Sequence, residues 1–167
     1  MQAQAIRTAS PIAETLARDE PLSFVAAATE SCHRRGLNMT PIRRRVLEVV
    51  AASPTPIAAY AIIHRLSDTK LLGPPTVYRA LEFLVEASFV RHLALRKAFV
   101  LCARPDEPFV AVLTCTACGD TSEVTSEEIR AAIAQFASST GFAPDGHAIE
   151  IEGRCATCRG AGADHVF

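Results

Sequence analysis

The hydrophobic pattern of the first half of the chain has the period of α-helices. Apolar residues recur at helical spacing over residues 22–36, and a glycine ends that run. A second amphipathic stretch begins after Thr40, which suits an N-cap, with Pro41 at the first helical position. Residues 57–66 predict a short third helix, and the segment after Pro75 predicts a fourth.

The helix expected after Pro75 has two distinct faces. The side expected to pack carries apolar and small residues, namely Val77, Ala80, Leu81, Leu84, Val85 and Ser88. Tyr78 lies on the flank, and Arg79 lies opposite the packed side, near the start of the helix. A helix with a packed back and an arginine-tyrosine front is suited to enter the major groove of DNA.

The pattern changes to alternation after this helix, and "FVRHLALRKAFVLC" predicts a β-hairpin. Three or four helices followed by a hairpin are typical of a winged-helix domain. A two-residue turn at Arg96-Lys97 would place Arg91 opposite Cys102 and turn His92 to the other face. A three-residue loop or a bulge would place His92 and Cys102 on the same face, and the pattern leaves both registers open.

The second half of the chain predicts strands combined with one helix. Strands are expected near residues 109–115, 120–125 and 147–152, and the last strand leads into "GRCATC". A helix is expected after Ser126, with acidic residues in its first turn, and Gly141 ends it.

Charge separates the chain into two parts of opposite sign. Residues 21–92 hold nine Lys and Arg against five acidic residues, whereas residues 93–167 hold six against ten. A length of 167 residues is enough for two small domains. We therefore expect an α+β protein whose two domains have different tasks. The expected organisation is a flexible tail (1–20), a winged-helix domain (21–102), a linker (103–108) and an α/β domain (109–167).

The sequence favours a cytoplasmic protein with no membrane partner. No apolar run approaches the roughly 20 residues that a membrane span needs. The N-terminal segment lacks the apolar region of a secretory signal. Stable disulfides are unusual in the reducing cytosol, so this location weighs against paired cysteines as bridges.

Four of the six cysteines form two C-x-x-C pairs, which are Cys115 with Cys118 and Cys155 with Cys158. Disulfides, a redox dithiol, buried free thiols and a metal site are the alternatives. Two such pairs match a tetrahedral four-cysteine zinc site, and the 36 residues between the pairs can hold a strand, a helix and a strand. A closed site with four thiolates leaves no open coordination position, so the expected zinc is structural.

The positive first half concentrates charge on two of the expected helices. Arg43, Arg44 and Arg45 lie in the first turns of one helix, and Tyr78 and Arg79 lie on the front of another. A solvated helix face and a DNA-binding surface are both open, and arginine side chains can contact phosphates or bases. An enzyme is not expected, since the sequence has no phosphate-binding glycine loop and no nucleophile–base signature.

Six stretches of the chain together resemble one known family. These are "MTPIRRRVLEVV", "IAAYAII", "PPTVYRALEFLVEASFV", "AFVLC", "CTACG" and "GRCATC". In this order, over about residues 22 to 159, they resemble the ferric uptake regulator (Fur) family, most closely its zinc-sensing branch, Zur. The resemblance implies a homodimeric, metal-activated repressor of zinc-uptake genes, with an N-terminal winged-helix domain that binds operator DNA and a C-terminal α/β dimerisation domain.

The resemblance also implies a second, regulatory metal in addition to the structural zinc. Its expected ligands include Cys102, which ends "VLC", and Glu123 after the first cysteine pair. Arg91 stands where the zinc-sensing branch has a histidine, and His92 is its neighbour; His147 matches another metal-site position of the family. Sensing of iron, manganese or peroxide, and a zinc-containing redox or scaffold protein without a DNA role, are the alternatives.

Overall fold

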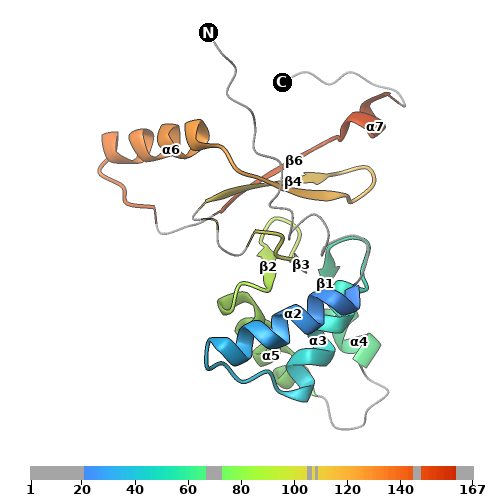
Figure 1. Ribbon diagram of the computed structural model, residues 1–167. Helices are drawn as coiled ribbons and strands as arrows, with labels where there is room; N and C mark the ends of the chain where they lie inside the picture. The colour runs from blue at the N-terminus through green and yellow to red at the C-terminus, as the bar shows by residue number, and fades with distance from the viewer. Residues whose placement is uncertain (1–20, 67–72, 105–106, 108, 145–147, 161–167) are drawn as a thin grey trace. The chain divides into compact units, whose positions relative to one another are not determined.

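The computed structural model is shown in Figure 1. It describes residues 21–66, 73–104, 107, 109–144 and 148–160. The chain divides into two compact units, which are the described residues up to 104 and those from 107 onward. The expected tail over residues 1–20 lies outside the described residues, and the predicted domain limits stay a prediction.

The first unit combines four described helices with a small sheet (Figure 1). Its elements are α2 (Pro21–Arg34), α3 (Pro41–Ala51), β1 (Ile57–Ala58), α4 (Ala59–Leu66), α5 (Pro74–Glu86), β2 (Val90–Leu93) and β3 (Ala98–Leu101). The strand order is β1-β3-β2, and both pairings are antiparallel. Helices followed by a hairpin confirm the predicted winged-helix pattern.

Local signals in the sequence place α3 as predicted. The side chain of Thr40 caps the helix by accepting a hydrogen bond from the backbone N–H of Arg43, and Pro41 occupies the first turn. The buried face of α3 then packs with that of α5 in one core. The buried residues of these two helices are Val46, Leu47, Val50, Val77, Ala80, Leu81 and Leu84.

Two local predictions in this unit are wrong. The expected helix over residues 57–66 begins only at Ala59, because Ile57 and Ala58 form β1 and pair with β3. Val85 was expected on the packed side of α5 but is 36% exposed. The packed stripe of α5 is narrower than the sequence predicts, and Val85 lies at its edge.

The hairpin has a four-residue loop, so both loop lengths considered from the sequence are wrong. Leu93 pairs with Ala98 and Arg91 pairs with Val100. Lys97 closes the loop in a left-handed conformation with φ +49°. Relative to the two-residue turn, this register is shifted by two residues, which leaves every side chain on the same face.

The second unit is a three-stranded sheet with two helices (Figure 1). Its elements are β4 (Val110–Cys115), β5 (Thr121–Val124), α6 (Glu127–Ser139), β6 (Ala148–Gly153) and α7 (Ala156–Gly160). The central strand β4 pairs antiparallel with β5 and parallel with β6. Ser126 caps α6 as predicted, by accepting from the N–H of Ile129. Five residues carry no detectable helical period, so α7 was not predicted.

This unit buries few side chains among its described residues. In α6 only Ala137 is buried, whereas Phe136 is 74% exposed. On one face of the sheet, Leu113 and Ile151 are neighbours across β4 and β6 and are both partly exposed. No helix in the described part of the chain is long and apolar enough to cross a membrane.

Candidate metal centre and nucleic-acid interface

Parallel pairing of β4 and β6 brings the two cysteine pairs together. Cys115 is the last residue of β4 and lies opposite Gly153, the last residue of β6. Parallel strands end at the same edge of a sheet, so the turn after β4 and the start of α7 meet there. The four cysteines are thus neighbours because of the strand–helix–strand topology, which the spacing of the pairs predicts.

Backbone hydrogen bonds shape the turn that holds the first pair. The N–H of Gly119 donates to the carbonyl of Cys115 at 2.9 Å, and the N–H of Cys115 donates to the backbone carbonyl of Asp120 at 2.8 Å. Gly119 adopts φ +76°, a conformation that glycine enters without steric cost. The N–H of Thr116 also donates to Gly153 at 2.7 Å, which ties this turn to the end of β6.

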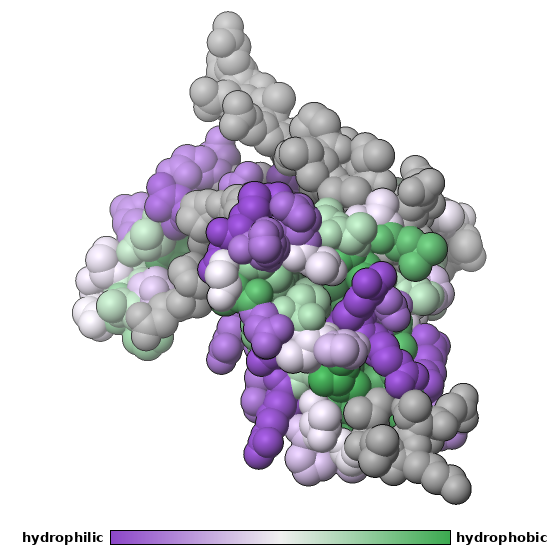
Figure 2. Space-filling model, turned by 60° about the horizontal axis from the view of Figure 1, so that its bottom comes forward, coloured by the Kyte–Doolittle hydropathy of each residue, from purple (hydrophilic) through white to green (hydrophobic). Residues whose placement is uncertain are grey.

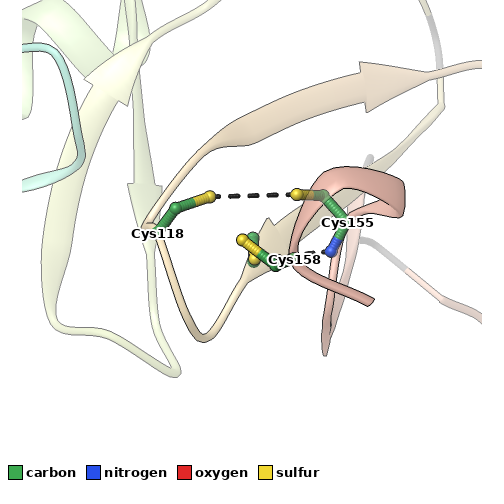
Figure 3. A group of neighbouring side chains, drawn as sticks. Cys118, Cys155 and Cys158 are labelled. Atoms are coloured by element: carbon green, nitrogen blue, oxygen red, sulfur yellow. Dashed lines mark hydrogen bonds between the residues drawn. The ribbon is translucent and has the colours of Figure 1, made fainter. Parts of the chain in front are cut away.

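The four sulfur atoms form one compact cluster. The Sγ atoms of Cys115, Cys118, Cys155 and Cys158 all lie within 4.8 Å of one another. Cys118 Sγ and Cys155 Sγ are 3.9 Å apart (Figure 3). A tetrahedral zinc ion with bonds of about 2.3 Å would hold its sulfur ligands about 3.8 Å apart. All four cysteines are free, so the geometry favours a metal site over disulfides.

The protonation of the four thiols also favours binding of a cation. The backbone N–H of Cys155 donates to Cys115 Sγ at 3.4 Å and, with further donors, lowers the pKa of Cys115 to about 6. The side chain of Cys155, followed by those of Cys118 and Cys115, raises the pKa of Cys158 to about 12. One thiolate is therefore favoured at Cys115, while Cys158 holds its proton, chiefly because its thiol hydrogen-bonds to the neighbouring sulfur atoms and only to a lesser degree because of the nearby negative charge. A bound divalent cation favours loss of that proton.

The exposed front of α5 carries the predicted tyrosine and arginine. Tyr78 is 48% exposed and Arg79 is also exposed, while Val77 and Ala80 beside them are buried. The fold therefore fixes α5 from behind and leaves its N-terminal half open. With the bottom of Figure 1 turned forward, hydrophilic side chains cover much of the visible surface, with smaller hydrophobic areas between them (Figure 2).

The three consecutive arginines of α3 have different surroundings. The guanidinium of Arg43 lies over the ring of Phe83 on α5, 3.6 Å from its centroid, and donates to the carbonyl of Asn38. Arg44 is exposed and pairs with Glu48 at 3.0 Å, and Arg45 is half-buried. The stacking of Arg43 joins α3 to α5. No local sequence signal predicts it, because the two residues are 40 positions apart.

His92 and Cys102, two of the expected regulatory ligands, lie on different faces of the hairpin. Cys102 follows β3 and is only 3% exposed. His92 is exposed on the opposite face of the hairpin, where its ring lies 4.9 Å from that of Phe99. Glu123 lies on β5 of the second unit, and His147 lies outside the described residues. The structure therefore does not bring His92 and Cys102 together.

Arg91 is the residue that contacts the Cys102 thiol. Its Nη2 atom donates to Cys102 Sγ at 3.2 Å. The register of the hairpin explains the contact, since Arg91 pairs with Val100, two residues before Cys102 and on the same face. A two-residue turn would also have placed Arg91 on this face.

Comparisons with known proteins give matches that include residues of both units. The Ferric uptake regulator family model matches residues 34–152. The zinc uptake regulation protein of Escherichia coli (strain K12) is 34% identical over 138 residues, which cover 81% of this chain and 81% of that protein.

Similar solved structures extend over most of the chain. One is a zinc uptake regulator complexed with zinc and DNA, with a TM-score of 0.77 and 32% identity, covering 86% of this chain and 98% of that one. Another is the crystal structure of holo XcZur, with a TM-score of 0.75 and 36% identity, covering 83% and 98%.

Proposed function

This chain belongs to the ferric uptake regulator family, and on that premise we propose that it is a zinc-responsive transcriptional repressor. In this proposal a zinc-loaded homodimer binds operator DNA in the cytoplasm and represses zinc-uptake genes, without catalysis. The observation that carries the proposal is the likeness of both units to a zinc uptake regulator complexed with zinc and DNA.

We propose the four-cysteine cluster as a structural zinc site. Its donor set is all thiolate, which zinc prefers, and the spread of its sulfur atoms, within 4.8 Å, suits tetrahedral coordination. A zinc ion held by Cys115, Cys118, Cys155 and Cys158 would neutralise the thiolates. It would also join the turn after β4 to α7 and so stabilise a unit with a small core.

The front of α5 is the proposed reading surface for DNA. Tyr78 and Arg79 are exposed near its N-terminal end, where a recognition helix contacts base edges. Arg44 and Arg45 are proposed to contact phosphates from α3. For Arg43, the stacking on Phe83 supports a further role in fixing α3 against α5.

A second copy of the chain is the proposed cover for the apolar surface of the second unit. Phe136 is 74% exposed, Phe142 is 67% exposed and Ile129 is 40% exposed. Exposed aromatic and aliphatic side chains of this size mark an interaction surface. A homodimer would also present two α5 helices to a two-fold symmetric operator.

For the regulatory metal, we propose Cys102 as the principal ligand, with Glu123 and His147 as further donors. The soft thiolate of Cys102 favours zinc over manganese. His92 is the weakest member of the set, because it faces away from Cys102. Bound metal would favour the DNA-binding conformation, with residues 103–108 as the proposed hinge. The metal can shift the equilibrium between the two conformations only as far as its affinities for them differ.

The DNA interface is tested by Arg79→Ala. Operator affinity, measured by fluorescence anisotropy on the promoter region of the gene itself at saturating zinc, is expected to fall by about tenfold or more, the usual cost of losing a base contact. The matched control is Arg34→Ala, which removes an exposed arginine of α2 that pairs with Glu30 at 3.8 Å. Equal affinities for wild type and Arg79→Ala would contradict the proposed interface.

A further inference from the structure

The hairpin of the first unit places a cation directly on the buried Cys102 thiol. Arg91 Nη2 donates to Cys102 Sγ at 3.2 Å, and the sulfur belongs to a residue that is 3% exposed. The backbone pairing of the hairpin, and not only the side-chain rotamer of Arg91, brings about this contact. The ladder of β2 and β3 pairs Arg91 with Val100, and this register aims the arginine at the side of the hairpin on which Cys102 lies.

A guanidinium and a metal ion compete for the same sulfur. Both are positively charged, and both use the electron pairs that the sulfur offers. A metal cation that approaches Cys102 is therefore repelled by the guanidinium, and it binds most favourably when Arg91 withdraws. The exchange breaks the Nη2–H···Sγ hydrogen bond, forms a metal–sulfur bond and releases to solvent any proton that the sulfur carries.

We propose that Arg91 is a resident cation at the regulatory thiol and sets the free zinc concentration at which this repressor responds. The contact of Arg91 with Cys102 favours the metal-free form, so the response threshold lies above that of the same site with a neutral residue at position 91. This inference rests on the proposed function, in which Cys102 is a regulatory ligand.

Three substitutions separate charge from position. Arg91→Gln keeps an N–H donor but removes the charge, whereas Arg91→Lys keeps the charge on a different side chain. Arg96→Gln removes the same charge from the loop of the same hairpin and serves as the matched control. Far-ultraviolet circular dichroism and one zinc per four-cysteine cluster show that each variant is folded.

The first readout is metal binding without DNA. Protein with a zinc-filled cluster is titrated with Co²⁺, and the sulfur-to-cobalt charge-transfer band reports each additional thiolate ligand. Arg91→Gln is expected to bind cobalt about ten- to hundredfold more tightly than wild type, the usual value of a hydrogen bond to a charged group. Arg91→Lys and Arg96→Gln are expected to stay close to wild type, and Cys102→Ala in the Arg91→Gln background is expected to abolish the band.

The second readout is operator binding at buffered free zinc, where the half-maximal concentration should fall by a similar factor in Arg91→Gln. Equal cobalt affinity in wild type and Arg91→Gln would overturn the inference, as would an Arg91→Lys protein that behaves like Arg91→Gln. Failure of the proposed function has a different signature, namely wild-type operator binding that ignores zinc. In that case, tighter cobalt binding through Cys102 in Arg91→Gln than in wild type still supports the role of Arg91 as a resident cation. Absence of a charge-transfer band from Cys102 rejects that role.

Discussion

The two units of this chain are stabilised in different ways. The first unit buries a continuous core in which Leu47, Ile62, Leu81 and Leu84 are at most 1% exposed. The second unit is a three-stranded sheet whose longest helix buries only Ala137. We therefore expect apolar burial to supply most of the stability of the first unit, and bound zinc and a second copy to contribute a larger share in the second.

The difference matches the tasks proposed for the two units. A DNA-reading helix must hold its position in the monomer, so α5 is fixed from behind by its own core. The stability of the second unit should respond to zinc and to a second copy of the chain, because ligands that bind only the folded form stabilise it.

Loss of one cluster thiolate should unfold the second unit selectively. Structural zinc contributes about 10–16 kcal/mol in zinc-finger peptides, so we expect Cys155→Ser to release zinc and melt the sheet while the helices of the first unit persist. Zinc content and circular dichroism melting curves check this. The control Cys32→Ala removes a buried thiol of α2 and should retain the zinc. Full zinc occupancy in Cys155→Ser would contradict the cluster.

Loss of a core side chain should destabilise the first unit and leave the second unit intact. Leu84 is fully buried on α5, and Leu→Ala substitutions in cores cost about 2–5 kcal/mol. We expect Leu84→Ala to lower the melting temperature of the first unit and to leave the zinc content unchanged. A variant that lost its zinc together with the helices would show that the units do not fold independently.

A charge on the exposed face of α6 should separate the homodimer. Phe136→Asp replaces an aromatic ring by a carboxylate. The ring is 74% exposed in one chain and is covered in the proposed dimer, where a buried charge is unfavourable. Sedimentation should shift toward the monomer, with a loss of at least about tenfold in association. Tyr60→Asp alters a residue of the first unit that is 76% exposed and serves as the control. An unchanged dimer would exclude this face.

The smallest effect concerns one strained turn of the first unit. Ser88 follows α5 with φ +61°, a left-handed conformation that costs a residue with a side chain about 1–2 kcal/mol. Ser88→Gly should therefore raise the stability of this unit by about 0.5–1 kcal/mol, after allowing for the freedom of glycine in the unfolded chain. The neighbouring Ala87 has φ −76°, so Ala87→Gly should destabilise instead. Thermal melting distinguishes the two signs.

Much of the fold follows from local signals in the sequence. Thr40 and Pro41 start α3 at the predicted position, and Ser126 starts α6. The spacing of the cysteine pairs also predicts the strand–helix–strand element that brings the sulfur atoms together. These features depend on residues close in sequence or on a topology with few alternatives.

Features that depend on tertiary contacts were not predictable in the same way. The hairpin loop has four residues because of how β2 and β3 pair, and alternation alone does not fix a loop length. The stacking of Arg43 on Phe83 and the contact of Arg91 with Cys102 join distant positions. The candidate metal cluster could thus be derived from the sequence, whereas the surroundings of Cys102 required the structure.

Zinc is proposed to control operator binding by this protein. The most direct test is the affinity of the purified protein for its own promoter region at buffered free zinc, with iron and manganese measured in parallel. We expect weak binding when zinc is chelated, although the structural site stays filled, and tight binding when zinc alone is restored. Tight binding at every zinc concentration, or recovery by iron or manganese instead of zinc, would contradict the proposed role of zinc.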